Sequence, residues 1–243
     1  IVPVPASIGD GDNPRTNLYW GCGYGVKTFF KKSDDWQLIK SLKIDSVILE
    51  RLIFFNRKQN TYHIADAYRG KEIRQCTIDF FKASAGAIDK QIKINDSLFL
   101  NTNQAMLVNY VGHNGLMDFT LKSYPSRVDT TNRKVFVLAC MANTYYNKGL
   151  KKCNAQPYVW TTHYMAPEAY TLFAIIENWM ANKSGTDADE AAAQASPFGG
   201  IIASGFQTLM VAFRLTIDTG LFEACSMGSP GMDAVRWMTP VRP

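Results

Sequence analysis

The sequence predicts an α/β fold over residues 1–183, with a mostly parallel sheet flanked by helices. Short, continuously apolar segments of strand length alternate with segments whose apolar residues recur at helical spacing. The chain has 243 residues, 47% hydrophobic and 19% charged, which suits one large domain or two small ones. No apolar run approaches the roughly 20 residues that cross a bilayer, so no membrane span is expected.

Four apolar segments have the length and composition of buried strands. They are residues 61–68, 105–112, 134–139 and 158–162. Amphipathic helices are predicted over residues 71–85 and 167–180, the second with a proline in its first turn, and a further helix is expected to begin at Cys140. Because buried strands alternate with helices, we expect a parallel sheet covered on both faces.

The amino-terminal segment, residues 1–14, is rich in proline, glycine and aspartate and is typical of a loop. Residues 18–25 place three glycines among aromatic residues, which favours backbone packed closely against rings over a phosphate cradle. The chain starts at Ile1 rather than methionine, so we expect that an upstream segment was removed, processed or left out, a cleaved export signal being one explanation. Localisation therefore stays open between the cytoplasm and export.

The charge distribution changes along the chain. The net charge is +5, but residues 1–183 hold 23 Lys and Arg against 15 Asp and Glu, whereas residues 184–243 hold 3 against 6. The small, polar segment 183–190 is typical of a linker, so we expect a domain boundary near residue 184. The basic residues are scattered, which favours a solvated surface over a nucleic-acid partner.

The cysteines and histidines argue against two kinds of structural site. An odd number of cysteines in a chain of this size does not predict a disulfide framework. The three histidines are spaced 50 residues apart and there is no CxxC pair, so neither a metal site nor a cofactor is expected. The cysteines are Cys22, Cys76, Cys140, Cys153 and Cys225.

Two chemically capable side chains, His113 and Cys140, follow successive predicted strands, and ligand sites lie at the carboxyl ends of parallel strands. A nearby histidine and a helix N-terminus favour the cysteine thiolate, and the histidine can protonate a leaving amine. Backbone N–H groups after Cys140, with that of Asn114 or Gly115, are expected to form an oxyanion hole. The alternative is that the cysteine only packs and the histidine is a hydrogen-bonded loop residue.

The segments Val111-Gly-His-Asn-Gly115 and Val137-Leu-Ala-Cys140 resemble the caspase-like cysteine peptidases, which include caspases, gingipains, clostripain and legumain. In that group one strand ends in His-Gly and a neighbouring strand ends in Ala-Cys. The resemblance implies a fold of that type for residues 1–183 and hydrolysis of a peptide or protein substrate by a Cys/His dyad. In this chain Asn114 stands between the histidine and the glycine.

Two further residues are weaker candidates for the same edge. Asp66 is expected near a strand end, where its carboxylate could line a pocket for a basic substrate side chain, with helix capping as the favoured alternative. His163 follows the fourth predicted strand and could assist the site, but a structural role is favoured.

The last sixty residues carry a second resemblance. Residues 187–205 and 231–243 are similar to MaoC-like hotdog-fold dehydratases, which implies hydration or dehydration of acyl thioesters. The segment Ser196-Pro-Phe-Gly-Gly200 would open a central helix, expected over 201–218, with a strand over 233–238. N–H groups at that helix N-terminus can polarise a thioester carbonyl. No histidine follows His163, so a hotdog-like fragment is predicted for residues 184–243.

Three functions are therefore open. A cysteine peptidase that uses Cys140 and His113 is the leading hypothesis. The alternatives are an acyl-thioester hydratase-derived module and a noncatalytic α/β binding protein. A fusion, a truncation or a composite chain would explain two resemblances that meet at one polar segment.

Overall fold

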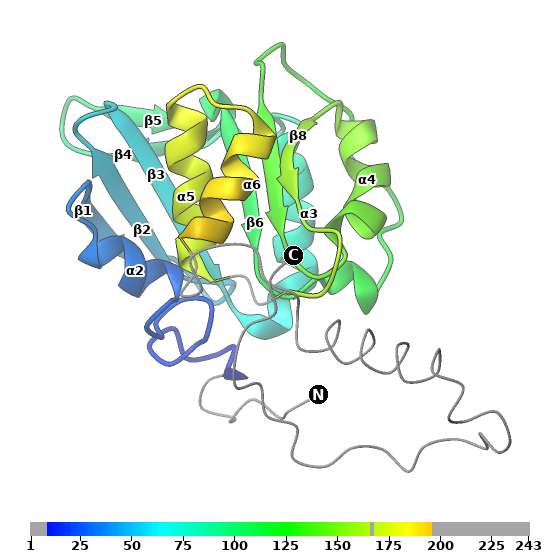
Figure 1. Ribbon diagram of the computed structural model, residues 1–243, viewed down its shortest axis with the longest axis horizontal. Coiled ribbons are helices and arrows are strands. Elements are labelled where there is room, and N and C mark those ends of the chain that lie inside the picture. Colours follow the sequence, from blue (N-terminus) through cyan, green and yellow to red (C-terminus); the bar gives the residue numbers. More distant parts are fainter. Residues whose placement is uncertain (1–8, 166–167, 196–243) are drawn as a thin grey trace, which may run out of the picture. The chain divides into compact units, whose positions relative to one another are not determined.

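The computed structural model describes residues 9–165 and 168–195. Within these residues the fold is mixed α/β, with five α-helices and three sheets, one of them parallel (Figure 1). The predicted α/β class is confirmed at this level. In the part of the chain described, no helix is both long enough and apolar enough to cross a bilayer.

The first sheet is an antiparallel meander in the order β1-β2-β3. Its strands are β1 (Trp36–Leu42), β2 (Ile48–Asn56) and β3 (Thr61–Tyr68), and a short helix, α2 (Val26–Lys32), precedes them. The prediction that residues 61–68 belong to the parallel sheet is therefore wrong. Only a four-residue turn joins β2 to β3, and a connection this short allows antiparallel pairing alone.

The parallel sheet has the order β6-β7-β8. These strands, β6 (Leu107–Val111), β7 (Lys134–Leu138) and β8 (Gln156–Trp160), confirm three of the predicted strands. The helix α4 (Ala142–Cys153) forms the crossover from β7 to β8. It corresponds to the helix that the sequence predicts from Cys140 onward.

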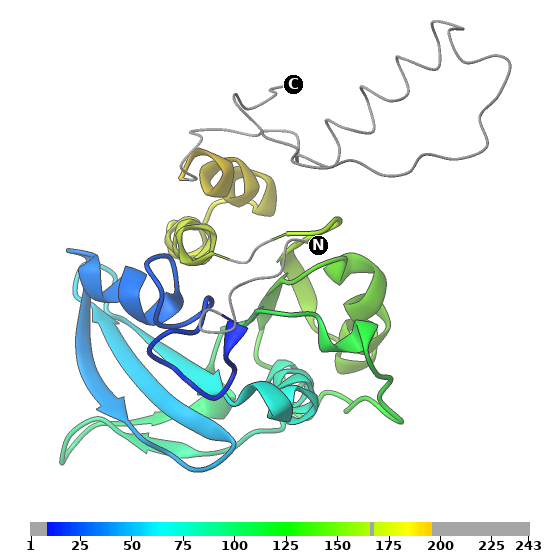
Figure 2. The same cartoon turned by 90° about the horizontal axis from the view of Figure 1, so that it is seen from below.

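Apolar side chains cover both faces of β7. Phe136 and Leu138 point into one core cluster, while Val135 and Val137 point into another, and all four are at most 1% exposed. The first cluster contains α2, α5 (Ala169–Met180) and residues of both large sheets, and the second contains α3 (Ile73–Ser84) and α4. Figure 2 shows α2, α5 and α6 on the side of the sheets opposite α3.

A small hairpin closes the remaining face of the antiparallel sheet. It consists of β4 (Gln91–Lys93) and β5 (Phe99–Asn101), and its Ile92 packs with Ile53 of β2 in a third core cluster. In the part of the chain that the structure describes, three short 3-10 helices connect the elements. They are η1 (Gly70–Glu72), which leads into α3, η2 (Thr102–Gln104) and η3 (Gly115–Met117).

The segment expected as a linker forms a helix instead, α6 (Gly185–Gln194). Ser184 and Asp187 form a reciprocal N-terminal cap, in which each backbone N–H donates to the side chain of the other. Ala188 and Ala192 are buried in the core at 0% and 8% exposure. The chain divides into two compact units after Ala192. The predicted hotdog-like helix 201–218 and strand 233–238 lie outside the described residues.

His63 of β3 lies inside an aromatic cluster. Its ring centroid is 5.0 Å from that of Phe30 and 5.9 Å from that of Trp36, and the residue is 8% exposed. The Nε2 atom is buried without a hydrogen-bond partner among the described residues. Burial lowers the pKa of His63 to about 4, because the charged ring cannot be solvated there.

We expect this histidine to make stability depend on pH. Between pH 6.5 and 4 the unfolded chain binds a proton at His63 that the folded chain does not, so the stability contributed by the neutral ring falls as pH falls through this window. The loss should reach roughly 3 kcal/mol below pH 4. Urea denaturation at pH 4 to 7 measures it. His63→Phe should remove this part of the pH dependence, and the matched change His163→Phe at an exposed site should retain it.

Candidate active site

The parallel register brings the two candidate catalytic residues to one level. Val111 of β6 pairs with Leu138 of β7, an offset of 27 residues, and the same offset connects His113 with Cys140. Each residue lies two positions beyond its strand, at the carboxyl edge, and neighbouring strands run about 4.8 Å apart. The N–H of Gly112 still donates to Leu138 (3.1 Å), so the pairing continues one residue past β6.

The two loops are also joined directly. The Asn114 side-chain amide donates to the Cys140 carbonyl oxygen over 2.7 Å. This bond fixes the distance between the loop that carries His113 and the loop that carries Cys140. The predicted placement of His113 and Cys140 on adjacent parallel strands, at the same sheet edge, is therefore what the structure has.

Cys140 is partly buried, and its sulfur lies against the loop after β8. The Sγ atom is 3.4 Å from the Met165 carbonyl oxygen and 3.5 Å from the Met165 nitrogen, which donates to it. The thiol in turn donates to the Met165 carbonyl oxygen, so both backbone polar groups of Met165 contact the sulfur. Sequence reasoning did not find this residue, because a backbone contact leaves no mark on the side-chain pattern.

His113 is half exposed and pairs with a carboxylate. Its Nε2 atom lies 2.6 Å from Asp118 Oδ2, with exposures of 50% and 59% for the two side chains. The Tyr110 hydroxyl donates to the His113 carbonyl oxygen (2.7 Å) and holds the backbone of this residue. Asp118 was missed from the sequence. The only sequence signal for Asp118 is that an acidic residue stands five positions after the histidine. The 3-10 helix η3 returns the chain so that this carboxylate contacts the imidazole ring.

His113 and Cys140 are not hydrogen-bonded to each other among the described contacts. The ring uses Nε2 for Asp118, which leaves Nδ1 as the nitrogen for exchange with a thiol. Catalytic hydrogen bonds of this kind commonly shorten only in the substrate complex.

The Asn114 side chain does not bind substrate from its position, while the oxyanion role of its backbone N–H stays a prediction. The residue is 0% exposed, and its side-chain oxygen accepts the N–H of Leu116 at 3.0 Å while its amide holds Cys140. Both ends of the side chain are therefore used within the protein. Asn114 is a positioning residue that caps η3 and ties it to the cysteine loop.

Gly115 is likewise surrounded by protein. A side chain at this position would meet Phe119 at 2.9 Å and Ile73 at 3.0 Å, so glycine permits η3 to pack against α3. Its backbone also hydrogen-bonds to the Tyr110 hydroxyl, where it partly offsets the burial that raises the pKa of Tyr110. The oxyanion role expected of the Gly115 backbone N–H stays a prediction.

The backbone directly after Cys140 is held by the β8 loop. Met141 has a left-handed conformation (φ 54°, ψ 34°) that is unusual for a residue with a side chain, and its N–H donates to the His163 carbonyl oxygen over 3.0 Å. The Met141 N–H is therefore engaged within the protein. This contact also gives His163 the structural role that the sequence favoured, since its exposed ring bonds only Thr162 among the described residues.

Asp66 does not reach this edge. It lies within β3 and forms a bidentate ion pair with Arg51 on the paired strand, with both N···O distances at 2.6 Å. The carboxylate is thus already neutralised by a guanidinium. The predicted specificity pocket at Asp66 is not formed, and the capping alternative does not apply either.

The loop before α2 brings Tyr19 to the edge of the parallel sheet. The ring lies 4.0 Å from the Cβ position of Gly112, whose φ of +147° is one that residues with side chains rarely adopt. Burial, and after it the negative charge of the Cys140 thiolate, raises the pKa of the Tyr19 hydroxyl. Tyr19 is therefore a neighbour of the end of β6 that the sequence did not identify.

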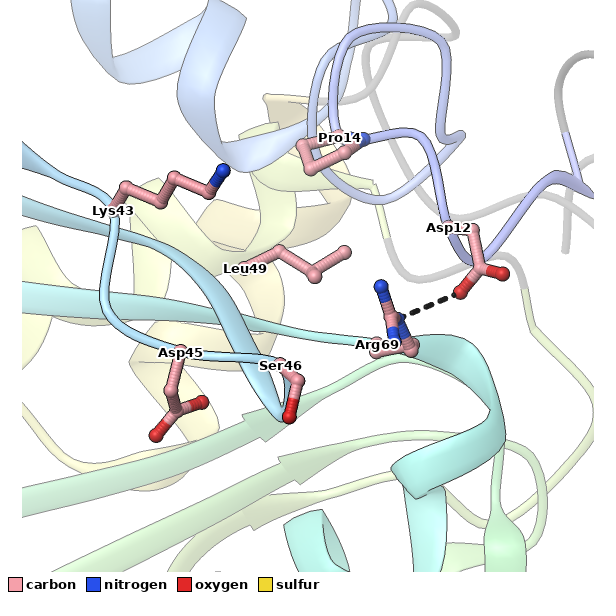
Figure 3. Close-up of a pocket in the computed structure, with 7 residues that line it drawn as sticks. All are labelled: Asp12, Pro14, Lys43, Asp45, Ser46, Leu49 and Arg69. Atoms are coloured by element: carbon pink, nitrogen blue, oxygen red, sulfur yellow. Dashed lines mark ion pairs between the residues drawn. The ribbon is translucent and has the colours of Figure 1, made fainter.

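A separate surface hollow of about 490 Å³ lies by the β1–β2 turn and the amino-terminal loop (Figure 3). Its charges are balanced, because Arg69 pairs with Asp12 at 3.0 Å and Asp45 accepts backbone N–H groups of its own turn. None of its lining residues comes from the ends of β6, β7 or β8. They are Asp12, Pro14, Lys43, Asp45, Ser46, Leu49 and Arg69.

No family model matches the chain, and neither a curated protein nor a solved structure matches it. Among the residues that the structure describes, no group of three or more His, Cys, Asp and Glu side chains could hold a metal ion.

Proposed function

We propose that the chain is a caspase-like cysteine peptidase in which Cys140 is the nucleophile and His113 the general acid and base. The observation that supports this proposal most is the shared offset of 27 residues, which puts both side chains two positions beyond adjacent parallel strands. Sites in open parallel sheets are built at this edge. A thiol and an imidazole at the same level are the two groups that acyl transfer through a thioester requires.

In the proposed reaction His113 accepts the Cys140 proton, and the sulfur forms a bond to the carbonyl carbon of the substrate. The bond between that carbon and the amide nitrogen then breaks, and the amine leaves with the proton from His113. Water hydrolyses the thioester, which releases a carboxylate and restores the thiol. Asp118 acts as a positioning residue, because its contact with Nε2 orients the ring.

Selective alkylation tests the assignment of the nucleophile. Burial raises the pKa of Cys76 to about 12 and that of Cys153 to about 11, so both thiols should react slowly near neutral pH. We expect iodoacetamide to modify Cys140 first, and His113→Ala to slow that modification by about tenfold, since the imidazolium favours the thiolate. Mass spectrometry of peptides from timed samples measures each site.

His163→Ala is the matched control, because this histidine contacts the cysteine loop through its carbonyl oxygen and should leave the alkylation rate unchanged. Equal labelling of all cysteines, or a Cys140 rate that does not respond to His113→Ala, would count against the proposal.

The second resemblance leads to a separate proposal for the second unit. A MaoC-like module there would act on acyl thioesters, and it would need an acidic group and a histidine facing the N-terminus of the 201–218 helix. These residues lie outside the described part of the chain, so the peptidase proposal does not depend on them.

A further inference from the structure

Two cationic side chains flank an apolar one in the hollow by the β1–β2 turn. In Figure 3 the Lys43 side chain and the Arg69 guanidinium lie on either side of the Leu49 side chain. Pro14 adds a second apolar group to the lining. The Asp45 carboxylate points away from Leu49 and accepts two backbone N–H groups of its own turn. An anion with an apolar group therefore matches this arrangement better than a cation does.

Neither of these two cations is fully used within the described part of the protein. The Lys43 ammonium has no hydrogen bond or ion pair there. Arg69 pairs with Asp12 through Nε over 3.0 Å, but this contact lacks the alignment of a hydrogen bond, and the two terminal nitrogens of Arg69 have no acceptor among the described residues. By contrast, Arg51 uses both Nε and Nη2 for the carboxylate of Asp66. The terminal nitrogens of Arg69 are therefore available to a carboxylate from a ligand.

Backbone contacts hold the walls of the hollow. The Arg69 N–H donates to the Val47 carbonyl oxygen over 2.8 Å, and the Gly70 N–H donates to the Gly11 carbonyl oxygen over 2.9 Å. A Cβ on Gly11 would lie 2.6 Å from the Gly70 Cα, so only glycine lets the amino-terminal loop approach η1 this closely. The backbone that carries Arg69 is thus in place before a ligand binds, which lowers the entropic cost of binding.

We infer that this hollow binds a carboxylate next to an apolar group, as found in a small organic acid or in the C-terminal residue of a peptide. The carboxylate accepts hydrogen bonds from the terminal nitrogens of Arg69 and pairs with Lys43, and the apolar group lies against Leu49. The volume of about 490 Å³ lies within the range of small-molecule sites. None of the lining residues comes from the Cys140 edge, so the inference goes beyond the proposed function and does not rest on it.

Ligand-observed saturation-transfer NMR with the full chain tests the site. The probes are acetyl-leucine, the peptide acetyl-Gly-Gly-Leu with a free carboxylate, and acetyl-leucine amide. We expect at least one of the two acids to bind with a Kd of about 1 mM, and the amide to bind about tenfold more weakly because it lacks the charge. Tighter binding of the peptide identifies a peptide C-terminus as the ligand, and tighter binding of acetyl-leucine identifies a small acid.

Three variants at the hollow give effects of opposite sign. Arg69→Gln should weaken binding of the acid by about tenfold and Lys43→Gln by about threefold, because each removes a charged donor. Asp12→Asn should strengthen it by about threefold, since it removes the carboxylate that competes for Arg69. If the pair of Arg69 and Asp12 serves only to hold the loop, Asp12→Asn should weaken binding instead.

Lys82→Gln is the matched control, because this exposed lysine of α3 lies outside the hollow and its loss changes the net charge equally. Its Kd should equal the wild-type value. The inference is overturned by equal binding of acid and amide, by no saturation up to about 20 mM acid, by weaker binding in Asp12→Asn, or by an effect of Lys43→Gln no larger than that of Lys82→Gln. Cys140→Ala should bind the acid as the wild type does, so a failure of the peptidase proposal is distinguished from a failure of this site.

Discussion

Cys140→Ala should abolish peptide hydrolysis, with a loss of about 10⁴-fold or more in kcat, because no other group can form the thioester. The change is small in volume and removes only a sulfur that contacts the Met165 backbone, so the fold should persist. The measurement is the rate of cleavage of a mixture of quenched fluorescent peptides by purified variants, with circular dichroism to confirm that each variant is folded.

Cys22→Ser is the appropriate control for this experiment. Cys22 is also a partly buried free thiol, and its sulfur donates to the Thr16 carbonyl oxygen, a contact that a serine hydroxyl can replace. Its activity should match the wild type. Hydrolysis that survives in Cys140→Ala would assign the activity to another group or to a contaminant, and the dyad would be rejected.

Arg133→Ala should lower the free energy of unfolding by about 3 to 5 kcal/mol. Arg133 is 0% exposed and directly precedes β7, where its guanidinium donates to the carbonyl oxygens of Asn103 and Ala105. It also pairs with Asp129 at 2.8 Å. Removing it leaves these acceptors without their donor and leaves Asp129 with Arg127 as its remaining ion-pair partner, at 3.5 Å. Urea denaturation followed by circular dichroism measures the change.

Arg133→Lys should lose an intermediate amount, since an ammonium group cannot reproduce the forked donor geometry. Arg57→Ala at an exposed turn is the control and should change stability by less than about 0.5 kcal/mol. A loss at Arg133 no larger than at Arg57 would show that the buried guanidinium does not secure the starts of β6 and β7.

The parallel strands were predictable because each is buried on both faces. Residues 134–138 alternate between two core clusters, so the sequence shows one continuous apolar run of strand length. The helices α3 and α5 were also predictable, since each has one apolar face against the sheets. Their observed bounds lie within the predicted ranges.

Other elements were not predictable from periodicity. β2 has buried residues at adjacent positions and no clean alternation, so the antiparallel meander gave no clear signal, and residues 61–68 were assigned to the wrong sheet. The segment before α6 carried a capping signal, Ser184 followed by an acidic residue at position 187, that its small polar composition obscured. The glycines at 21 and 25 pack closely, but against backbone rather than the expected aromatic rings.

The candidate site was predictable in its two reactive side chains and not in its surroundings. His113 and Cys140 each follow an apolar segment of strand length, and such segments can be recognised in the sequence alone. Tyr19 lies 94 residues before His113 and 121 before Cys140, on a loop with no regular structure, and only tertiary folding brings it to the edge. Asn114 is adjacent to the histidine, but its inward direction depends on the turn η3 and cannot be inferred from spacing.

The offset between β6 and β7 also determines how the lengths of the segments around the proposed site could vary. Residues inserted on the connection between residues 119 and 132 would change the sequence interval from His113 to Cys140 but not their shared level, because each is counted from the end of its own strand. One residue added between Val111 and His113 would shift the imidazole relative to the sulfur. Long insertions should therefore be tolerated between residues 119 and 132. A single insertion between Val111 and His113 should not be tolerated.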